Sequence, residues 1–351
     1  MQDKVDYIIV GLGIAGTCFA RQCLEHGKSF RIITDFESSA SHVAAGLFNP
    51  IVIKRFNPVW RFQHQMQLLQ ETFSAFEDLL GGNYLHYPPV YRIFSNEQEI
   101  VTWKEKITSM ESLQFYLNPT PIETKVDQIY SPYGFGEVKG TGWVDLAAVL
   151  YDFSNKFQEY IIQNSFDYAQ LDVSEGVRYR ELKADKIIFA EGVKVLNNPF
   201  FNFIPIRPNK GETLIIETHT ELPNVTFNSK NFLMPIGDKR YYVGSTYDRE
   251  WDDAGPTEEN KQKLIKQLKF YFKGDFNILE HRAAFRPTTP NMRPILGSHP
   301  TLPHMYVLNG LGTRGTFNGP DMARELFEFL EDEKPLDKEI DVKRYYKLLK
   351  N

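Results

Sequence analysis

The residues best suited to chemistry in this sequence are glycines, which form two turns near opposite ends of the chain. In "IIVGLGIAGTCFA", three of them make a G-x-G-x-x-G pattern. The first glycine of such a pattern allows a tight turn, the second lets the backbone approach a pyrophosphate, and the third lets a helix pack closely on a strand. The pattern predicts a dinucleotide site whose phosphate contacts are Gly11, Gly13, Ile14, Ala15 and Gly16.

The segments around this turn supply the elements that such a site needs. Residues 5–10 and 30–35 are predicted buried strands, and residues 14–26 are a predicted helix that ends at Gly27. The N-terminus of this helix would present unpaired N–H groups and a partial positive charge to phosphates. Asp35, at the end of the second strand, is placed to accept hydrogen bonds from a ribose diol. These residues leave both NAD and FAD open as the ligand.

A second glycine-rich turn, in "LNGLGTRGTFNGPD", follows another predicted buried strand, residues 305–310. Pro320 and Asp321 are typical of a first helical turn, so the last long helix is expected to open at Gly319. A helix N-terminus favours negative charge, and a reduced flavin is anionic near its N1–C2=O edge, whereas reduction removes the charge of a nicotinamide. FAD therefore fits both turns, and NAD leaves the second one unexplained. The predicted contacts of this turn are Gly310, Gly312, Thr313, Arg314, Gly315 and Thr316.

The order of the other segments predicts two interleaved domains. Parallel-type strands lie at both ends and in the middle of the chain, and "GETLIIET", "NFLMPIG" and "RYYVGSTY" are typical of antiparallel strands. Long helices are expected over residues 57–82 and 145–162. The predicted fold class is α/β, with a Rossmann-like FAD-binding domain of the glutathione-reductase type interleaved with an antiparallel-sheet α+β substrate domain. The expected segments are 1–50, 131–205 and 281–351 for the FAD-binding domain, and 51–130 and 206–280 for the substrate domain.

The composition argues against several classes of protein. A net charge of −5 gives no general attraction to nucleic acid or to an anionic membrane. The only two cysteines, Cys18 and Cys23, fall on one predicted helix where they do not face each other, so no disulfide framework is expected. The eight histidines lack the spacing of metal ligands, so no metal site is expected. No apolar run reaches membrane-spanning length and the first strand leaves no room for a signal peptide, so a cytoplasmic protein is expected.

Several segments together carry a resemblance to a known family over about residues 1–335. They are "VGLGIAG", "AAGLFNP", "IIFAEG", "KGETLII", "YYVGSTYDRE", "FRPTTPNMRPILG" and "GLGTRG". This set resembles the D-amino acid oxidase/glycine oxidase family of FAD enzymes. Within that family, "VGSTYDRE" and "GLGTRG" look similar to the FAD domain of the bifunctional tRNA 5-methylaminomethyl-2-thiouridine biosynthesis enzyme, without its methyltransferase domain.

The resemblance implies contacts for both the cofactor and the substrate. Arg286, in "FRPTTP", would bind the carboxylate of a substrate, because a guanidinium presents two parallel N–H donors to the two carboxylate oxygens. Ala190 and Gly192 would lie near the adenosine–pyrophosphate part of FAD. The residues expected to line the flavin are Ser41, His42, Ala44, Ala45 and Gly46.

The sequence also departs from the family pattern. A tyrosine that assists the arginine in the oxidases is matched by Phe232, which cannot donate a hydrogen bond, so Tyr242 or Tyr247 is the candidate replacement. Asn291 stands where the family often has an acid. Members that bind flavin covalently use a cysteine near the C-terminus, and this chain has none there, so non-covalent FAD is expected.

The resemblance implies oxidation of the C–N bond of a small amine or amino acid. Hydride would pass to flavin N5, the resulting imine would hydrolyse, and O₂ or another acceptor would take the electrons. One alternative is removal of a carboxymethyl group from a modified wobble uridine in tRNA, which is less favoured because the chain is acidic overall. The other alternative is a flavoprotein subunit that binds FAD without turnover.

Overall fold

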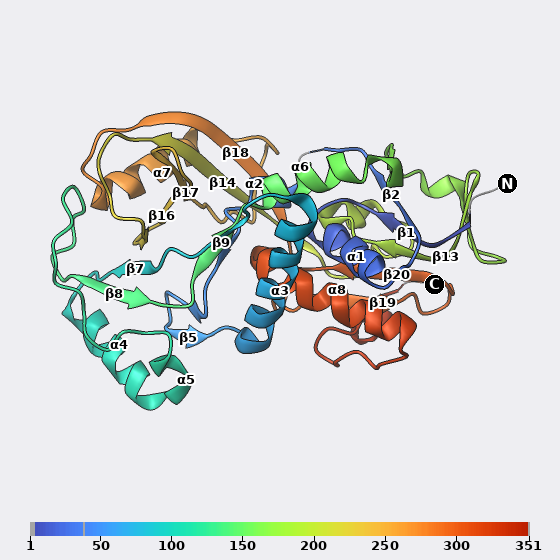
Figure 1. Cartoon of the computed structure of the whole chain (residues 1–351), viewed down its shortest axis with the longest axis horizontal. Coiled ribbons are helices and arrows are strands. Elements are labelled where there is room, and N and C mark those ends of the chain that lie inside the picture. The colour runs from blue at the N-terminus through green and yellow to red at the C-terminus, as the bar shows by residue number, and fades with distance from the viewer. Residues whose placement is uncertain (1–3, 38, 350–351) are drawn as a thin grey trace.

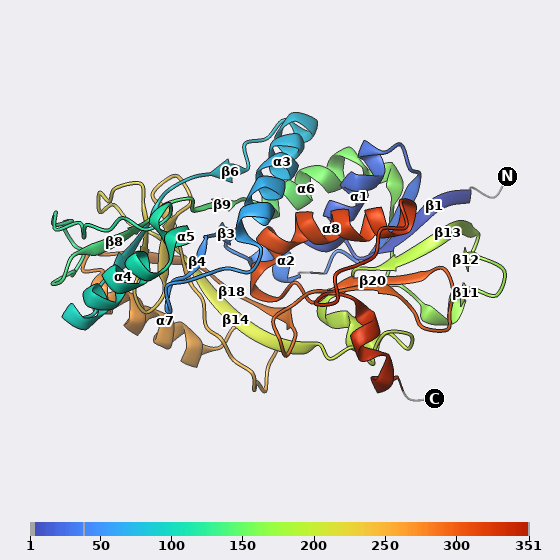
Figure 2. The ribbon, with the colours of Figure 1, turned by 90° about the horizontal axis from the view of Figure 1, so that it is seen from below.

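The computed structural model describes residues 4–37 and 39–349, and its strands form two large sheets (Figures 1 and 2). In the first sheet, β1 is central and pairs in parallel with β2 and β13, as a dinucleotide-binding β-α-β unit requires. The second glycine turn enters this sheet through β20, which pairs in parallel with β13. The strands are β1 (Lys4–Val10), β2 (Phe30–Thr34), β10 (Ile161–Gln163), β11 (Leu171–Asp172), β12 (Val177–Tyr179), β13 (Leu182–Phe189), β19 (Ile295–Ser298) and β20 (Met305–Asn309).

Four helices cover one face of the first sheet, as Figure 2 shows. They enclose a core of apolar side chains from helices and sheet, and the other sheet face packs against residues 195–206 and the C-terminal 3-10 helix η5 (Val342–Leu348). The packing is closest between α1 and α8, where a Cβ on Gly319 would lie 3.1 Å from Cγ1 of Ile14. The helices are α1 (Ile14–Glu25), α3 (Phe62–Leu80), α6 (Leu146–Lys156) and α8 (Gly315–Glu331).

The second sheet is antiparallel except where β15 pairs in parallel with β7. Helix α7 (Glu258–Tyr271) packs its apolar stripe on this sheet. In Figure 2 its two longest strands, β14 and β18, reach back toward the first sheet. The strands are β7 (Val90–Ile93), β8 (Phe135–Val138), β14 (Arg207–Glu217), β15 (Thr226–Asn228), β16 (Phe232–Pro235), β17 (Arg240–Gly244) and β18 (Asn277–Thr288).

Shorter elements join the two sheets. Helices α4 (Glu97–Ser109) and α5 (Glu111–Gln114) pack beside β7 and β8 around the buried Trp103. The small strands are β3 (Leu47–Phe48), β9 (Gly142–Val144) and β6 (Leu85–His86) in one sheet, and β4 (Ile51–Val52) with β5 (Asn57–Pro58) in another. The remaining helical turns are α2 (Ala40–Val43), η1 (Gln158–Tyr160), η2 (Tyr168–Gln170), η3 (Gly192–Asn197) and η4 (Gly312–Arg314).

The predicted interleaving is present, but two segments fall in a different sheet from the one expected. β8 lies within the segment 131–205 assigned to the FAD-binding domain, yet it pairs with β7 in the antiparallel sheet. Most of β18 lies within the segment 281–351, yet it pairs with β14 along its whole length. Each of these strands pairs with an antiparallel neighbour of the second sheet, β8 with β7 and β18 with β14. The division into two domains remains a prediction.

Three helix boundaries differ from those predicted. α8 opens at Gly315, so Pro320 lies inside the helix and not at its first position. α3 begins at Phe62, after Arg61 in a left-handed conformation (φ 52°), and not at residue 57. α6 ends at Lys156, because residues 161–163 pair with β2 as the strand β10.

Asp321 was read as a sign of a helix start, but it lies in the second turn of α8 and is fully buried against α3. Its carboxylate accepts a hydrogen bond from Nε2 of Gln65 (3.0 Å) and lies 3.6 Å from Nη1 of Arg61. The guanidinium of Arg61 also contacts Glu325 and Asp337. These contacts fix the register of α8 against α3, and thereby the position of the α8 N-terminus.

Within the described part of the chain, no helix is long and apolar enough to cross a membrane.

We predict that Asp321→Ala destabilises the protein, because it leaves polar partners of a fully buried carboxylate without an acceptor. The free energy of unfolding should fall by about 3 kcal/mol, as measured by urea denaturation of the apoprotein. Glu71→Ala, on the exposed face of α3, is the control and should change it by less than about 0.5 kcal/mol. Equal effects of the two changes would contradict a structural role for Asp321.

Candidate functional site

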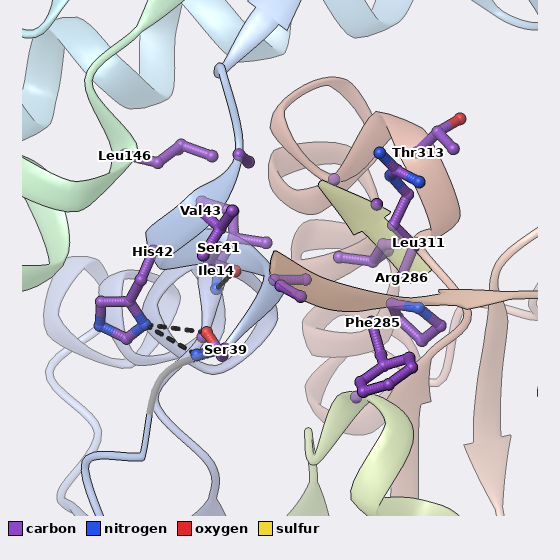
Figure 3. Close-up of a pocket in the computed structure, with 18 of the residues that line it drawn as sticks. Ile14, Ser39, Ser41, His42, Val43, Leu146, Phe285, Arg286, Leu311 and Thr313 are labelled. Atoms are coloured by element: carbon purple, nitrogen blue, oxygen red, sulfur yellow. Dashed lines mark hydrogen bonds between the residues drawn. The ribbon is translucent and has the colours of Figure 1, made fainter. Parts of the chain in front are cut away.

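One cavity of about 1310 Å³ runs between the two sheets and collects nearly all of the predicted residues. Its size exceeds the roughly 300–1,000 Å³ of a pocket for one small ligand, so it can hold a dinucleotide and a second molecule. Figure 3 shows Ile14, Ser41 and Val43 on one side of the cavity, and Leu311 and Thr313 on the other. The two glycine turns therefore face the same space.

The first glycine turn has the backbone shape that its sequence predicted. Gly11 has φ +102°, and a Cβ there would lie 2.6 Å from the carbonyl oxygen of Ala190. Gly16 does not line the cavity; a Cβ there would lie 2.0 Å from the carbonyl oxygen of Gly11, so it serves the close packing of α1. Gly13 is the N-cap of α1 and lines the cavity, as do Ile14 and Ala15. This turn brings backbone N–H groups to the cavity wall.

Asp35 directly follows β2 and lines the cavity, as predicted from the sequence. Its Oδ2 atom accepts hydrogen bonds from Nζ of Lys194 (2.6 Å) and Oγ of Ser165 (3.2 Å). Burial acts against ionisation, but the charge and hydrogen bond of Lys194, together with the bonds from Ser165 and the backbone of Glu37, outweigh it and lower the pKa of Asp35. The carboxylate is therefore charged and accepts hydrogen bonds at neutral pH. Lys194 was not predicted, because it belongs to η3, a part of the chain without a recognisable pattern.

The α2 region supplies the next part of the wall. Oγ of Ser41 accepts a hydrogen bond from the N–H of Ile14 (3.0 Å), which ties α2 to the first glycine turn (Figure 3). His42 is held by Ser39 through Nδ1 (3.0 Å), and burial lowers the pKa of His42, so its ring is neutral at neutral pH. Ala44 and Ala45 follow α2 and also line the cavity.

Gly46 ends this part of the wall with a close backbone contact. It has φ +65°, and a Cβ there would lie 1.8 Å from the carbonyl oxygen of Val144. Only glycine fits this position without moving the chain.

The second glycine turn faces the first across the cavity. Gly312, Thr313, Arg314, Gly315 and Thr316 line it, and the α8 N-terminus lies among them because the helix opens at Gly315. Gly310 does not line the cavity: a Cβ there would meet Cγ2 of Thr289 at 2.8 Å, so it shapes the turn.

The turn also links to the wall formed by η3, since Nδ2 of Asn309 donates to the carbonyl oxygen of Gly192 (2.9 Å). Burial lowers the pKa of Arg314, and no acidic side chain among the described residues forms an ion pair with it. These observations give this wall of the cavity an uncompensated positive charge.

Arg286 lies on β18, which passes close to the second glycine turn, and reaches across Gly211 of β14. Nη1 donates to Oδ1 of Asn209 (2.7 Å) and Nη2 to Oγ of Ser245 (2.6 Å), and both lie 3.2 Å from the carbonyl oxygen of Thr246. These acceptors are neutral, and within residues 4–37 and 39–349 no carboxylate forms an ion pair with this guanidinium. Burial lowers the pKa of Arg286, although its ordinary value is high enough to keep it charged.

Gly211 makes room for this arrangement. A Cβ at that position would lie 2.0 Å from Nη2 of Arg286, so any larger residue would displace the guanidinium. The sequence predicted a strand in "KGETLII" but gave no signal that its glycine faces an arginine on the neighbouring strand.

The two candidate tyrosines occupy different positions. Tyr242 is buried and lines the cavity, and burial raises its pKa to about 12, so its hydroxyl group stays protonated and can donate at neutral pH. Tyr247 is 51% exposed at the cavity wall, with its ring centroid 5.9 Å from Cζ of Arg286. Phe232 also lines the cavity, whereas Asn291 is exposed and does not.

All of the predicted site residues except Gly16 and Gly310 therefore meet in one cavity. Sequence reasoning missed several polar residues of the wall, because they come from strands and turns with ordinary composition. They are Glu191, Lys194, Asn209, Thr213, Asn228 and Ser245, of which Asn209 contacts Arg286 without lining the cavity. In the described part of the chain, no group of three or more His, Cys, Asp or Glu side chains could hold a metal ion.

Comparisons with known proteins were made for the whole chain. The model of one protein family, described as "DAO: FAD dependent oxidoreductase", matches residues 6–328. Among curated proteins, the tRNA 5-methylaminomethyl-2-thiouridine biosynthesis bifunctional protein MnmC of Idiomarina loihiensis is 21% identical over 344 residues, which cover 92% of this chain and 55% of that protein. The chain thus spans about half the length of this relative.

Two other similar proteins match along their whole length. A glycine oxidase of Pseudomonas aeruginosa is 21% identical over 373 residues, which cover 96% of this chain and 97% of that protein. The crystal structure of iminodiacetate oxidase from Chelativorans sp. BNC1 superposes with a TM-score of 0.79 and 19% identity, covering 95% of this chain and 98% of that one. The second of these matches shows a shared fold.

We predict a pH dependence that originates at Glu191 in the cavity wall. Its carboxyl group accepts from the hydroxyl group of Tyr168 (2.5 Å) and from Nδ2 of Asn198 (2.8 Å), yet burial raises its pKa from an ordinary 4.5 to about 7. The folded state therefore holds a proton that the unfolded chain has released. Stability should fall as the pH rises from about 4.5 to about 7 and then level off.

Glu191→Gln tests this dependence, because the amide has the same shape and does not titrate. The difference in free energy of unfolding between the wild-type apoprotein and the variant, measured by urea denaturation at several pH values, should change over that pH range. A constant difference would mean that the pKa of Glu191 is not raised.

Proposed function

Since the chain belongs to the DAO family of FAD-dependent oxidoreductases, we propose that it oxidises the C–N bond of an amine or amino acid that carries a carboxylate. The observation that carries this proposal is Arg286, a half-buried cation with only neutral acceptors, in the cavity that holds the cofactor motifs. A carboxylate would supply the missing negative charge through charge-assisted hydrogen bonds.

The cavity residues fit FAD at each of its parts. Gly13 leaves space for a pyrophosphate, since a Cβ there would come no closer than 3.3 Å to another atom. Asp35 offers a carboxylate to a ribose, and the α8 N-terminus with Arg314 offers positive charge to the ring. Cys18 and Cys23 are both buried in α1, in line with FAD held without a covalent bond. When bound, FAD supplies the hydride acceptor, which no side chain can provide.

The side chains of the substrate end would bind and orient the substrate. Arg286 would hold the carboxylate, and the protonated hydroxyl group of Tyr242 would take the role that Phe232 cannot fill. The amine must enter in its neutral form, because an ammonium has no lone pair to assist the loss of hydride from the neighbouring carbon. Once the ammonium has lost its proton to water, the reaction requires no general base. The apolar wall around Met234 and Phe232 limits the access of water to the reacting carbon.

A modified tRNA uridine with a carboxymethylamino group is the second candidate substrate. MnmC is named for tRNA modification, and two exposed lysines, Lys54 and Lys230, line the cavity where a polyanion would approach. Arg61, by contrast, is engaged with Glu325 and Asp337. Binding of the modified tRNA that weakens steeply with rising salt would favour this substrate, and absent binding would exclude it.

An anaerobic reduction screen tests the proposal. The holoenzyme is mixed without oxygen with glycine, sarcosine, iminodiacetate, a panel of D-amino acids and carboxymethylaminomethyl-modified tRNA. Loss of the flavin absorbance with at least one carboxylated amine is the expected result. If none of them reduces the flavin, or if only amines without a carboxylate do so, the proposed reaction is wrong.

We predict that Arg286→Lys lowers kcat/KM for the carboxylated substrate by about 100-fold, because a lysine keeps the charge but loses the two parallel donors. Arg282→Lys is the matched control: Arg282 lies on the same strand, pairs with Glu280 outside the cavity, and should have no effect. Steady-state kinetics measure both variants. A normal kcat/KM in Arg286→Lys would show that this residue does not hold the substrate.

We predict that Gly211→Ala raises the KM by about tenfold, because the added Cβ displaces the guanidinium of Arg286. The melting temperature should change little, since the displaced atoms are the end of a flexible side chain. A KM for the carboxylated substrate equal to that of the wild type would show that the guanidinium keeps its position or is not used.

A further inference from the structure

A cluster of charged side chains lies on the face of β14 that points away from the cavity. Strand alternation turns Gly211 and Thr213 toward the cavity, so Lys210 and Glu212 point to the opposite side. Their side chains are 2% and 0% exposed, and Nζ of Lys210 lies 3.1 Å from Oε1 of Glu212. Lys210 and Glu212 are the two sequence neighbours of Gly211, the glycine that Arg286 reaches across.

The carboxylate of Glu212 is surrounded by donors. Oε2 accepts from the backbone N–H of Thr257 (2.9 Å), and Oε1 accepts from Oγ1 of Thr257 (3.1 Å) and Nδ2 of Asn260 (2.9 Å). Nε2 of His281 lies 2.9 Å from Oε2. Burial opposes ionisation, but the bonds from Asn260, Thr257 and Lys210 outweigh it and lower the pKa of Glu212. The group is therefore a buried anion at neutral pH.

The partners of this pair hold both ends of one loop, residues 249–256, which we call the flap. At its start, Lys210 and Asp248 exchange two backbone hydrogen bonds of 2.9 Å. Toward its end, Nζ of Lys210 donates to the carbonyl oxygen of Asp253 (2.7 Å), and Thr257 binds Glu212. Between these anchors the flap is almost entirely exposed.

The flap borders the cavity near Arg286. The ring of Trp251 packs on Phe285, with centroids 4.8 Å apart, and Phe285 is the neighbour of Arg286 on β18. Ala254 of the flap and Tyr247 just before it both line the cavity. Phe285 pairs with Lys210 and therefore points to the face of β18 away from Arg286, as Figure 3 shows, so Ala254 is the part of the flap that borders the cavity near the guanidinium.

The stability of the fold is a weak explanation for this cluster. Desolvation of a buried ion pair offsets most of its attraction, and apolar residues of the same volume often stabilise a core as well or better. The buried charges do, however, require one geometry of the anchoring residues, because all of their hydrogen bonds must form at the same time. A cluster that holds a loop in one position needs such a single geometry.

We propose that Glu212 is a positioning residue that fastens the flap at the edge of the cavity near Arg286 and thereby raises the affinity for a carboxylated substrate. This role rests on the proposed function of Arg286. With the flap fastened, the carboxylate and guanidinium meet with little competing water, which strengthens their attraction. Glu212 does not touch the substrate, so its loss should change KM and leave kcat nearly unaltered.

Trypsin cleavage after Arg249 tests the fastening without any substrate, because Arg249 is an exposed residue of the flap. In the holoenzyme, Glu212→Gln should speed this cleavage by about tenfold, since the neutral amide cannot accept from all of the donors. Tyr271→Phe is the matched control: it removes a buried hydrogen bond between α7 and Asn231 that does not reach the flap. Equal cleavage rates in the two variants would overturn the proposal.

The kinetic arm uses the best substrate from the reduction screen. Glu212→Gln should raise KM by about tenfold and change kcat by less than about threefold, whereas Tyr271→Phe should change neither. An equal fall in kcat and kcat/KM would overturn the proposal. If no substrate is found, the proposed function fails while the cleavage test still decides whether Glu212 fastens the flap.

A milder variant covers the case in which Glu212→Gln does not fold. Asn260→Ala removes one donor that bridges Glu212 and Asp248 (2.9 and 3.1 Å) but leaves the buried charges paired. It should speed cleavage after Arg249 by about threefold. A cleavage rate equal to that of the wild type in this variant would count against the proposal in the same way.

Discussion

The close approach of α1 and α8 is the constraint on which the rest of the site depends. Ile14 opens α1 directly after the first glycine turn, and the Cβ positions of Gly315 and Gly319 would lie 3.2 Å and 3.1 Å from its side chain. Larger residues would push the helices apart and separate their N-termini. Because the helices touch here, two turns that are some three hundred residues apart in the chain reach the same cavity. Both glycine turns thus contribute to one cavity, the arrangement expected for one long cofactor.

A second feature separates cofactor from substrate within the same cavity. β14 and β18 run from the substrate sheet toward the cofactor, and their pairing places Arg286 over Gly211. Because side chains alternate between the two faces of a strand, the two faces of β14 differ. One face leaves room for the guanidinium, and the other carries the buried pair of Lys210 and Glu212. One strand thus connects Arg286 with the anchors of the flap.

The sequence was most informative where one residue type is the only one that fits. Gly11 and Gly46 have positive φ values and face carbonyl oxygens at distances that exclude a Cβ, so the tight turns expected at glycines are present there. The sequence was misleading where a residue type is common in two different structural positions. Pro320 and Asp321 are frequent in first helical turns, yet here Asp321 binds Gln65 of α3 inside the helix. Lys194 and Asn209 could not be predicted, because only tertiary packing brings them to Asp35 and Arg286.

The hydrogen bonds of Arg286 have a consequence for the ligand selectivity of the cavity. Its donors are already satisfied by the oxygens of Asn209, Ser245 and Thr246, so an incoming group must displace bonds and cannot simply add to them. A neutral amide or ester isostere would trade one uncharged acceptor for another and gain almost nothing. An anion gains the full charge interaction in the exchange. Under the proposed role of Arg286, its resting hydrogen bonds would therefore favour acids over their uncharged analogues.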